Sequence, residues 1–223
     1  MEEKSLSSFS LKMIALITMA IDHTGAVLFP EEMAFRLIGR MSFPIYCFLL
    51  AEGFFYTSSR FRYLFRLLLL ALVSEPVFDL AFFDTLWYPG HQNVFWTLSM
   101  GLAAMWVLEK MQESPAIGMI LAAAFALLAE LCNTDYGAFG VVLILIFSVC
   151  RSRRGTGVGA FALVNSGYAL LLNPLQAAAV LSAVPIGLYN GKRGIRLPKL
   201  LFYAFYPVHL LLLFLIREAL TVS

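Results

Sequence analysis

Charged residues are scarce in this chain. Only 13% of its 223 residues are Asp, Glu, Lys or Arg, whereas 61% are hydrophobic. No polar stretch is long enough to fold as a separate aqueous domain, so composition predicts an integral membrane protein with one transmembrane domain over residues 1–223. The formal net charge of +2 is too small to indicate a nucleic acid partner.

Other features are absent too. The three cysteines, Cys47, Cys132 and Cys150, are odd in number and lack metal or redox spacing, so we expect small buried residues. No segment repeats at a fixed period, and the two-half hydropathy symmetry of many secondary transporters is missing, which argues against transport. The first apolar run has no convincing small-residue cleavage site, so we expect no removable signal peptide.

Long apolar runs, separated by Pro, Gly, Asn or charge clusters, dominate the remainder. Each is close to the ~17–25 residues that a helix needs to cross a bilayer. We therefore predict an all-α fold with about nine transmembrane helices. They lie near residues 10–29, 34–56, 62–83, 93–109, 115–132, 136–150, 157–172, 174–190 and 199–217. Asn173-Pro174 breaks one run into two short halves, which could cross fully or form a re-entrant pair.

The basic residues predict the orientation, because Lys and Arg accumulate in cytoplasmic loops. With the amino terminus inside and the carboxyl terminus outside, nearly all of them lie at the inner face of what we expect to be a bacterial cytoplasmic membrane. They are Lys4, Lys12, Arg60, Arg62, Lys110, Arg151, Arg153, Arg154, Lys192, Arg193, Arg196 and Lys199.

Several predicted spans contain ionisable residues, which are expensive in lipid and usually mark a site. The outer half of the bilayer would hold Asp22, His23, Arg36, Arg40, Glu75 and Asp79, and the inner half Glu52, Arg62 and Arg66. His209 would lie near the middle of the last span. We expect these groups to surround a polar intramembrane cavity.

Helix geometry limits the pairings. Neighbours on a helix point about 100° apart, so Asp22 and His23 should face different helices, and we pair Asp22 with Arg40. Glu75 and Asp79 are four residues apart on one face, so one is protonated or an arginine lies between them. Pro76, in the same span, favours a kink.

Structural interpretations of the same residues stay open. The Asp22 ion pair could be purely structural, His23 a satisfied core residue, and His209 a helix-to-helix hydrogen-bonding residue. The inner arginines could be simple anchors. No ligand spacing indicates a metal.

Ordered short motifs run from near Leu11 to near Leu215. The main ones are Ile21-Asp22-His23-Thr24-Gly25, Ile38-Gly39-Arg40, Ser74-Glu75-Pro76-Val77-Phe78-Asp79-Leu80, Asn93-Val94-Phe95 and Phe205-Tyr206-Pro207-Val208-His209. In this order they resemble the TraX family, membrane proteins known as pilin N-terminal acetylases of conjugation systems. Residues 145–195 add little to the resemblance.

The resemblance implies transfer of an acetyl group from acetyl-CoA to an amine, such as the amino terminus of a pilin-like peptide. A base must then take a proton from the nitrogen, which suits a histidine at neutral pH, and we assign this catalytic role to His23 beside Asp22. The CoA phosphates would bind Arg60, Arg62, Arg66 or Lys199 at the inner mouth. The acceptor or the oxyanion would be held by Arg40, Glu75, Asp79 or Asn93, with Tyr206 and His209 as secondary candidates. No metal is expected.

Three questions stay open at this stage. The acceptor could also be a sugar or lipid amine, or a hydroxyl group, since the base is needed in each case. A proton-coupled permease could use Asp22, His23, Glu75 and Asp79 as a relay. A non-catalytic membrane assembly protein would need the buried charges for helix packing alone.

Overall fold

The computed structural model describes residues 5–222, with every side chain in that range except those of residues 199, 200 and 222. Lys4 lies outside it. In the described residues the regular structure is helical, with two isolated β-bridges and no strand. Three segments are long and apolar enough to cross a bilayer: Ser8–Leu28, Met33–Tyr56 and Leu201–Thr221. The all-α, polytopic membrane fold is thus confirmed, whereas nine crossings stay a prediction.

The helices follow the predicted runs. They are α1 (Ser8–Leu28), α2 (Met33–Gly39), α3 (Ser42–Tyr56), α4 (Arg60–Phe83), α5 (Val94–Lys110), α6 (Pro115–Leu131), α7 (Gly137–Val149), the 3-10 turn η1 (Arg151–Arg153), α8 (Arg154–Leu171), the 3-10 helix η2 (Pro174–Ser182), α9 (Ala183–Gly187) and α10 (Lys199–Val222). The predicted span 34–56 is therefore two helices, α2 and α3, separated by Arg40 and Met41. The run 174–190 is a 3-10 helix followed by one short α-helix.

Side-chain caps fix where three of these helices begin. The Ser7 hydroxyl accepts a hydrogen bond from the Ser10 N–H at 3.1 Å, and the Ser59 hydroxyl accepts one from the Arg62 N–H at 3.2 Å. The Asn93 side chain likewise accepts from the Phe95 N–H at 3.0 Å. Each cap satisfies a backbone donor that has no partner in the first helical turn.

The chain divides into two compact units. The terminal unit comprises Met1–Leu49 with Arg153–Ser223, and the central unit comprises Leu50–Ser152. Helix α3 belongs to both, because the boundary falls after Leu49. The single transmembrane domain stays a prediction.

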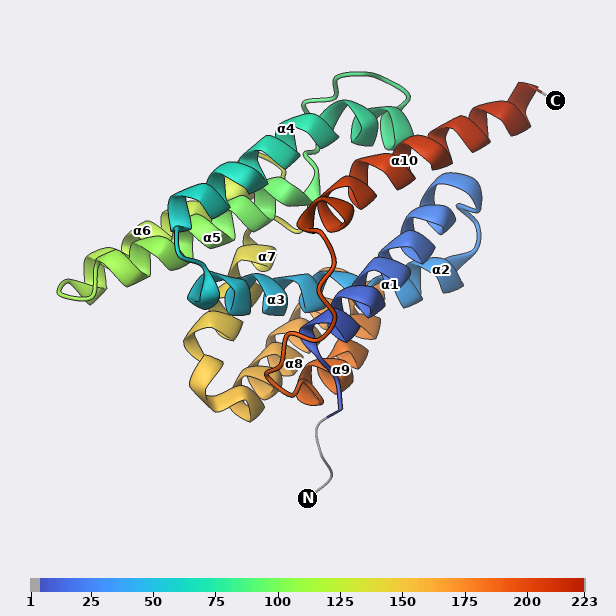
Figure 1. Cartoon of the computed structure of the whole chain (residues 1–223). Coiled ribbons are helices and arrows are strands. Elements are labelled where there is room, and N and C mark those ends of the chain that lie inside the picture. Colours follow the sequence, from blue (N-terminus) through green and yellow to red (C-terminus); the bar gives the residue numbers. More distant parts are fainter. Residues whose placement is uncertain (1–4, 223) are drawn as a thin grey trace. The chain divides into compact units, whose positions relative to one another are not determined.

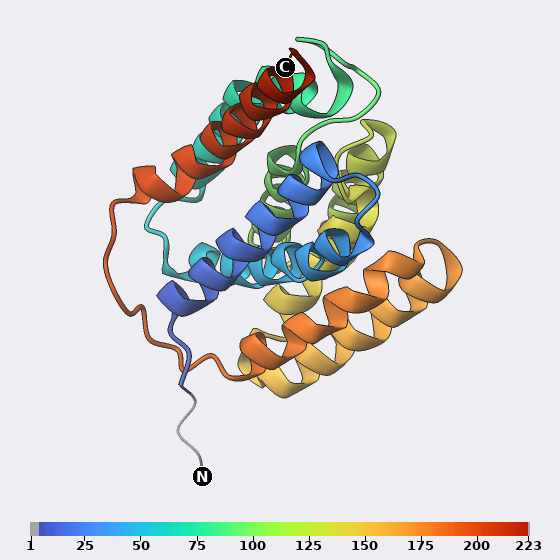
Figure 2. The same cartoon turned by 90° about the vertical axis from the view of Figure 1, so that its right-hand side faces the viewer.

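In the terminal unit, α1 packs against α2 and α10, and α8 packs against η2 (Figures 1 and 2). Two glycines allow α1 and α2 to approach closely. A Cβ atom at Gly25 would lie 2.2 Å from Phe35 Cβ, and one at Gly39 would lie 2.1 Å from Asp22 Cβ. Small residues at the contact are the usual means of close helix packing in membranes.

In the central unit, α5 packs against α4, α6 and α7, and the green pair α5 and α6 is visible in Figure 1. Ala104 on α5, Ala122 and Ala129 on α6, and Val141 on α7 form a buried apolar cluster. The expectation that all three cysteines are buried is wrong for two of them. Cys132 is exposed and Cys150 is half-buried, because each lies directly after the last turn of its helix.

Candidate functional site

Two histidines from distant parts of the sequence meet in the terminal unit. Nδ1 of His23, on α1, lies 2.6 Å from Nε2 of His209, on α10. Nδ1 of His209 lies 2.6 Å from the backbone oxygen of Phe205, one turn earlier in the same helix. Both histidines were predicted site residues, but the sequence did not indicate that they touch.

Aromatic rings enclose this pair. The Phe205 ring packs against the His209 ring, with centres 4.7 Å apart and planes 19° from parallel. The edge of Tyr206 meets both imidazoles, at 5.7 Å from His23 and 5.8 Å from His209, and Tyr206 is buried. Tyr206, predicted as a secondary candidate, thus contacts the proposed base.

The other member of the Asp-His pair faces a different helix, as predicted. Oδ2 of Asp22 accepts a hydrogen bond from Nη1 of Arg36 at 2.8 Å, whereas the predicted partner in this ion pair was Arg40. The physical reason is that the Arg36 guanidinium is the one that reaches Asp22, because its Nη1 also lies 3.3 Å from the Asp22 backbone oxygen. Both arginines act electrostatically on His23.

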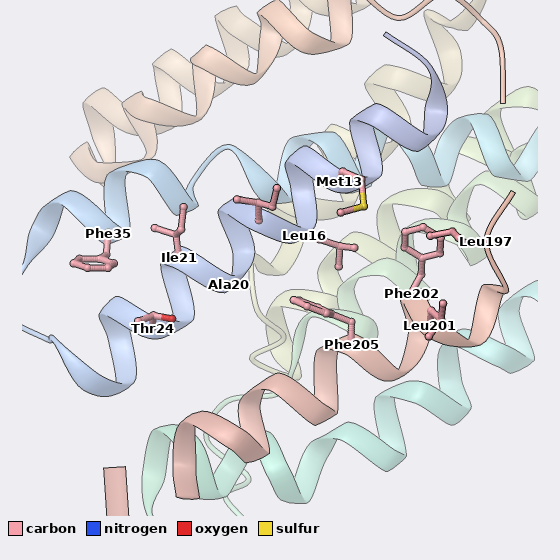
Figure 3. A pocket seen from close by; sticks show the side chains of 11 residues that line it. Met13, Leu16, Ala20, Ile21, Thr24, Phe35, Leu197, Leu201, Phe202 and Phe205 are labelled. Atoms are coloured by element: carbon pink, nitrogen blue, oxygen red, sulfur yellow. The ribbon is translucent and has the colours of Figure 1, made fainter. Parts of the chain in front are cut away.

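An apolar cavity of about 620 Å³ lies in the terminal unit (Figure 3). Its lining residues come mainly from α1 and α10, with one from α2. They are Met13, Leu16, Ile17, Ala20, Ile21, Thr24, Phe35, Leu197, Leu201, Phe202 and Phe205. Neither His23 nor His209 is among these lining residues. The link to the histidine pair is Phe205, whose ring lines the cavity and also packs against the His209 ring.

A basic residue lies beside this cavity. Nζ of Lys12 is 5.1 Å from the ring centre of Phe202, which forms part of the lining. Because Lys12 precedes His23 by eleven residues on α1, the two lie ~16 Å apart along the helix axis. Lys199, a predicted donor-binding residue, has a side chain outside the described ones, so its role stays a prediction.

The predicted carboxylates lie in the central unit, on α4. Glu75 accepts hydrogen bonds from the backbone N–H of Asn93 at 3.3 Å, from Nδ2 of Asn93 at 2.5 Å and from Nε1 of Trp96 at 2.7 Å. Asp79 accepts one from the Tyr88 N–H at 2.8 Å. Both carboxylates are buried, and the donors that hold them are neutral N–H groups, where an arginine was one of the two expected solutions. That one of them is protonated stays a prediction.

The predicted donor-binding arginines differ in their surroundings. Arg60 donates to both carboxylate oxygens of Glu109, at 3.2 and 2.8 Å, and to the backbone oxygen of Thr57. Arg62 is exposed. Arg66 lies 5.7 Å from the Tyr63 ring centre, and its Nε is buried with no hydrogen-bond partner among the described residues. The Arg60 guanidinium thus has more hydrogen bonds within the described part of the protein than those of Arg62 and Arg66, which favours a structural role for Arg60.

Sequence reasoning missed three contacts around these sites. Arg36 was noted as an intramembrane charge but not as the partner of Asp22, and Trp96 was not considered. Nε2 of His91, in the loop between α4 and α5, lies 3.7 Å from Oδ1 of Asp135. This contact with the Asp135 carboxylate raises the pKa of His91 above its ordinary value. Among the described side chains no three His, Cys, Asp or Glu residues converge as a metal site requires.

Comparisons with known proteins match nearly the whole chain. It is 32% identical to "Probable fimbrial assembly protein FimC, serogroup H1" of Dichelobacter nodosus, in an alignment that covers 93% of this chain and 94% of that protein. A shorter match, 44% identical over 45 residues, covers 20% of the chain and 18% of an uncharacterized protein of Rickettsia prowazekii (strain Madrid E). No solved structure matches significantly. The family model described as TraX protein matches residues 7–217, and the chain therefore belongs to the TraX family.

Proposed function

We propose that this protein is a membrane acyltransferase that moves an acetyl group from cytoplasmic acetyl-CoA to the amino terminus of a pilin-like subunit. One observation carries the proposal. A histidine inside an apolar helix is held by a second histidine, and Phe205, which packs against that second histidine, lines a 620 Å³ apolar cavity. Burying two imidazoles in such surroundings is costly, and such a cost in a membrane helix usually serves a function.

The chemistry needs a base at one point. The amine nitrogen attacks the thioester carbonyl, a C–N bond forms, the C–S bond breaks, and the nitrogen loses a proton. In the proposal His23 takes this proton and returns it to the leaving thiolate, which departs as the free thiol of CoA. An alternative sequence has His23 accept the acetyl group first and pass it to the amine, and it also requires the same imidazole.

Charged neighbours of His23 supply the remaining elements. The thioester oxygen becomes negative as the amine attacks, and we assign its stabilisation to Arg40, which acts electrostatically on His23. Arg36 is engaged with Asp22 at 2.8 Å, so we give that pair the task of holding α1 and α2 together.

The donor would use the apolar cavity for its arm and basic residues for its phosphates. Lys12 is 5.1 Å from the cavity residue Phe202, and a cation there suits an anionic group at the end of an apolar chain. Lys199, in the terminal unit, stays in the proposed phosphate-binding set, whereas the donor-binding role of Arg62 and Arg66, in the central unit, stays a prediction. Arg60 leaves it, since its guanidinium already binds Glu109 and Thr57.

The acceptor is proposed from the family and the relative. The chain belongs to the TraX family, and the relative of D. nodosus is named for fimbrial assembly. We infer that the acceptor is a fimbrial or pilin-like subunit and that the enzyme resides in the cytoplasmic membrane, with the amino terminus in the cytoplasm. Glu75, Asp79 and Asn93 are proposed to hold the loop that leads into α5 rather than the acceptor ammonium, because Asn93 donates to Glu75 and the Tyr88 N–H donates to Asp79.

A second candidate function is non-catalytic assembly of fimbriae. The name of the relative from D. nodosus, a probable fimbrial assembly protein, favours it. In that case the histidines would serve helix packing alone. The two candidates differ in one respect that can be measured, because only the acyltransferase consumes acetyl-CoA.

The test uses the purified protein in lipid nanodiscs with radiolabelled acetyl-CoA and a synthetic peptide that has a free pilin-type amino terminus. We expect thiol release and label on the peptide. His23→Ala should lower the rate about 100-fold or more, the usual contribution of a general base. His91→Ala is the matched control, since His91 lies in the loop after α4, and it should retain the rate. Normal turnover by His23→Ala, or no thiol release from the wild type with amine acceptors, would refute the proposal.

A further inference from the structure

The two imidazoles meet edge to edge. Their ring centres are 4.9 Å apart and their planes are 7° from parallel, with 2.6 Å between Nδ1 of His23 and Nε2 of His209. Two rings that lay face to face could not bring any atoms that close, because non-bonded atoms separate by about 3.5 Å or more. The rings therefore lie nearly in one plane, with one N–H directed at the lone pair of the other ring.

The direction of this hydrogen-bond chain follows from its last member. The backbone oxygen of Phe205 can only accept, so Nδ1 of His209 must carry the hydrogen. A neutral imidazole has one N–H, which leaves Nε2 of His209 as an acceptor. Nδ1 of His23 must then be the donor, and the unprotonated nitrogen of His23 is Nε2.

We infer that His209 is a positioning residue that fixes the tautomer and the ring orientation of His23, so that Nε2 of His23 is the atom that takes the proton from the acceptor. This inference rests on the proposed acyltransferase function and deepens it. His209 itself is excluded as the base, because both of its ring nitrogens are engaged, one with Phe205 and one with His23.

The arrangement also serves the protonated state. When Nε2 of His23 takes a proton, the ring becomes an imidazolium that still donates from Nδ1 to Nε2 of His209. The positive charge then strengthens this hydrogen bond, because a charged donor binds a neutral acceptor more tightly. The proton returns to the thiolate from Nε2, and the Nδ1 hydrogen stays in place throughout.

Packing around His209 keeps the acceptor in position. The Phe205 ring covers one face of His209, the Tyr206 edge meets both imidazoles, and the His209 side chain is only 9% exposed. A rotation of the His209 ring would break two hydrogen bonds in an apolar site, each of which is costly to leave unmade there. The tautomer of His23 is thus set by packing on α10.

The first test reads the tautomer directly and needs no activity. The chain has three histidines, so nitrogen NMR of protein labelled with ¹⁵N-histidine in nanodiscs gives few signals, and His91→Gln removes the third. We expect His23 and His209 both as Nδ1–H tautomers at neutral pH. An Nε2–H tautomer at His23 would overturn the inference, whether or not the protein transfers acetyl groups.

The second test asks whether the acceptor matters to turnover. His209→Gln can place an amide oxygen where Nε2 of His209 lies, whereas His209→Leu has a similar volume and no acceptor. We expect kcat to fall about 100-fold in His209→Leu and less than about tenfold in His209→Gln, with the KM for acetyl-CoA little changed in both. Equal loss in the two variants, or full kcat in His209→Leu, would overturn the inference. An inactive wild type would refute the proposed function, and the tautomer measurement would then decide on the inference alone.

Discussion

The terminal and central units each bury a cluster of polar side chains, and the two clusters differ in their hydrogen-bond partners. In the central unit Glu75 receives three hydrogen bonds from Asn93 and Trp96, and Asp79 receives one from the start of the next loop segment at Tyr88. In the terminal unit a hydrogen-bond chain runs from the backbone oxygen of Phe205 through His209 to His23, and the Phe205 ring lines the apolar cavity.

This difference in hydrogen-bond partners indicates which buried ionisable groups have a structural role. A carboxylate that receives N–H groups from the following loop and from a helix start fixes the loop, and its acceptor capacity is used within the protein. An imidazole whose Nδ1 donates to a fixed acceptor has a defined tautomer, in which Nε2 is the basic nitrogen. The expected burial of these residues did not distinguish the structural carboxylates from the proposed base. The direction of their hydrogen bonds does.

The sharpest test of this contrast compares Glu75→Ala with His23→Ala. Glu75→Ala leaves the N–H groups of Asn93 and Trp96 without their acceptor, at a cost of about 1–3 kcal/mol for each buried donor. We expect a clear fall in the thermal unfolding midpoint and a normal acetyl-transfer rate per folded molecule. His23→Ala should show the reverse order of effects, with the transfer rate lost and a smaller fall in the midpoint, because it leaves one acceptor, Nε2 of His209, without its partner.

Glu113→Ala provides the control for Glu75, because Glu113 is exposed between α5 and α6 and should change neither property. The contrast fails if Glu75→Ala loses turnover while its unfolding midpoint is unchanged. Such a result would return Glu75 to the acceptor site.

The course of the helices could be read from the sequence, because bilayer-length apolar runs and their Pro, Gly and Asn breaks set helix position locally. The separate directions of Asp22 and His23 also follow from helix geometry alone. The partner of Asp22 could not be derived, since Arg36 and Arg40 are one turn apart. The choice depends on which guanidinium reaches Asp22 once α2 packs closely against α1.

The hydrogen-bond partners of Glu75 and Asp79 could not be predicted from the sequence for a different reason. Glu75 and Asp79 bind backbone N–H groups of Asn93 and Tyr88, and every residue except proline carries such a group, so side-chain patterns cannot reveal them. The contact between His23 and His209 depends on how α1 packs against α10, because the two histidines are 186 residues apart in sequence. Motif order brought both residues into the candidate set without placing them together.

A smaller effect is expected where α1 and α2 approach each other. Gly39→Ala would put a Cβ atom 2.1 Å from Asp22 Cβ, so α2 must move away from α1, at about 1–3 kcal/mol for an overpacked contact. We expect a lower unfolding midpoint and a lower transfer rate, because Asp22 precedes the proposed base. Denaturation in detergent and the acetyl-CoA assay measure both.

Gly159→Ala is the matched control for this substitution. Nothing lies within 4 Å of an added Cβ at Gly159, on helix α8, so alanine there should be neutral or slightly stabilising. If Gly39→Ala were as stable as Gly159→Ala, the close approach of α1 and α2 would not be the feature that positions Asp22.

The smallest effect concerns the loops of the central unit and depends on pH. His91 lies 3.7 Å from Asp135, and this contact raises the pKa of His91 above its ordinary 6.5. Since the folded state binds the proton more tightly than the unfolded state, the stabilisation is fully present below pH 6.5. It is lost as the pH rises through the folded pKa. We expect the free energy of unfolding to fall slightly over this window.

His91→Gln should flatten this pH dependence, because glutamine does not titrate, while leaving stability above the window nearly unchanged. The effect is small because both partners are substantially exposed, at 40% and 35% of their side chains, and water screens such pairs. It separates the third histidine from the other two, since His91→Gln should leave acetyl transfer intact. A fall in transfer rate in His91→Gln, with the stability profile unchanged, would place chemistry in the central unit and reverse the contrast between the two clusters.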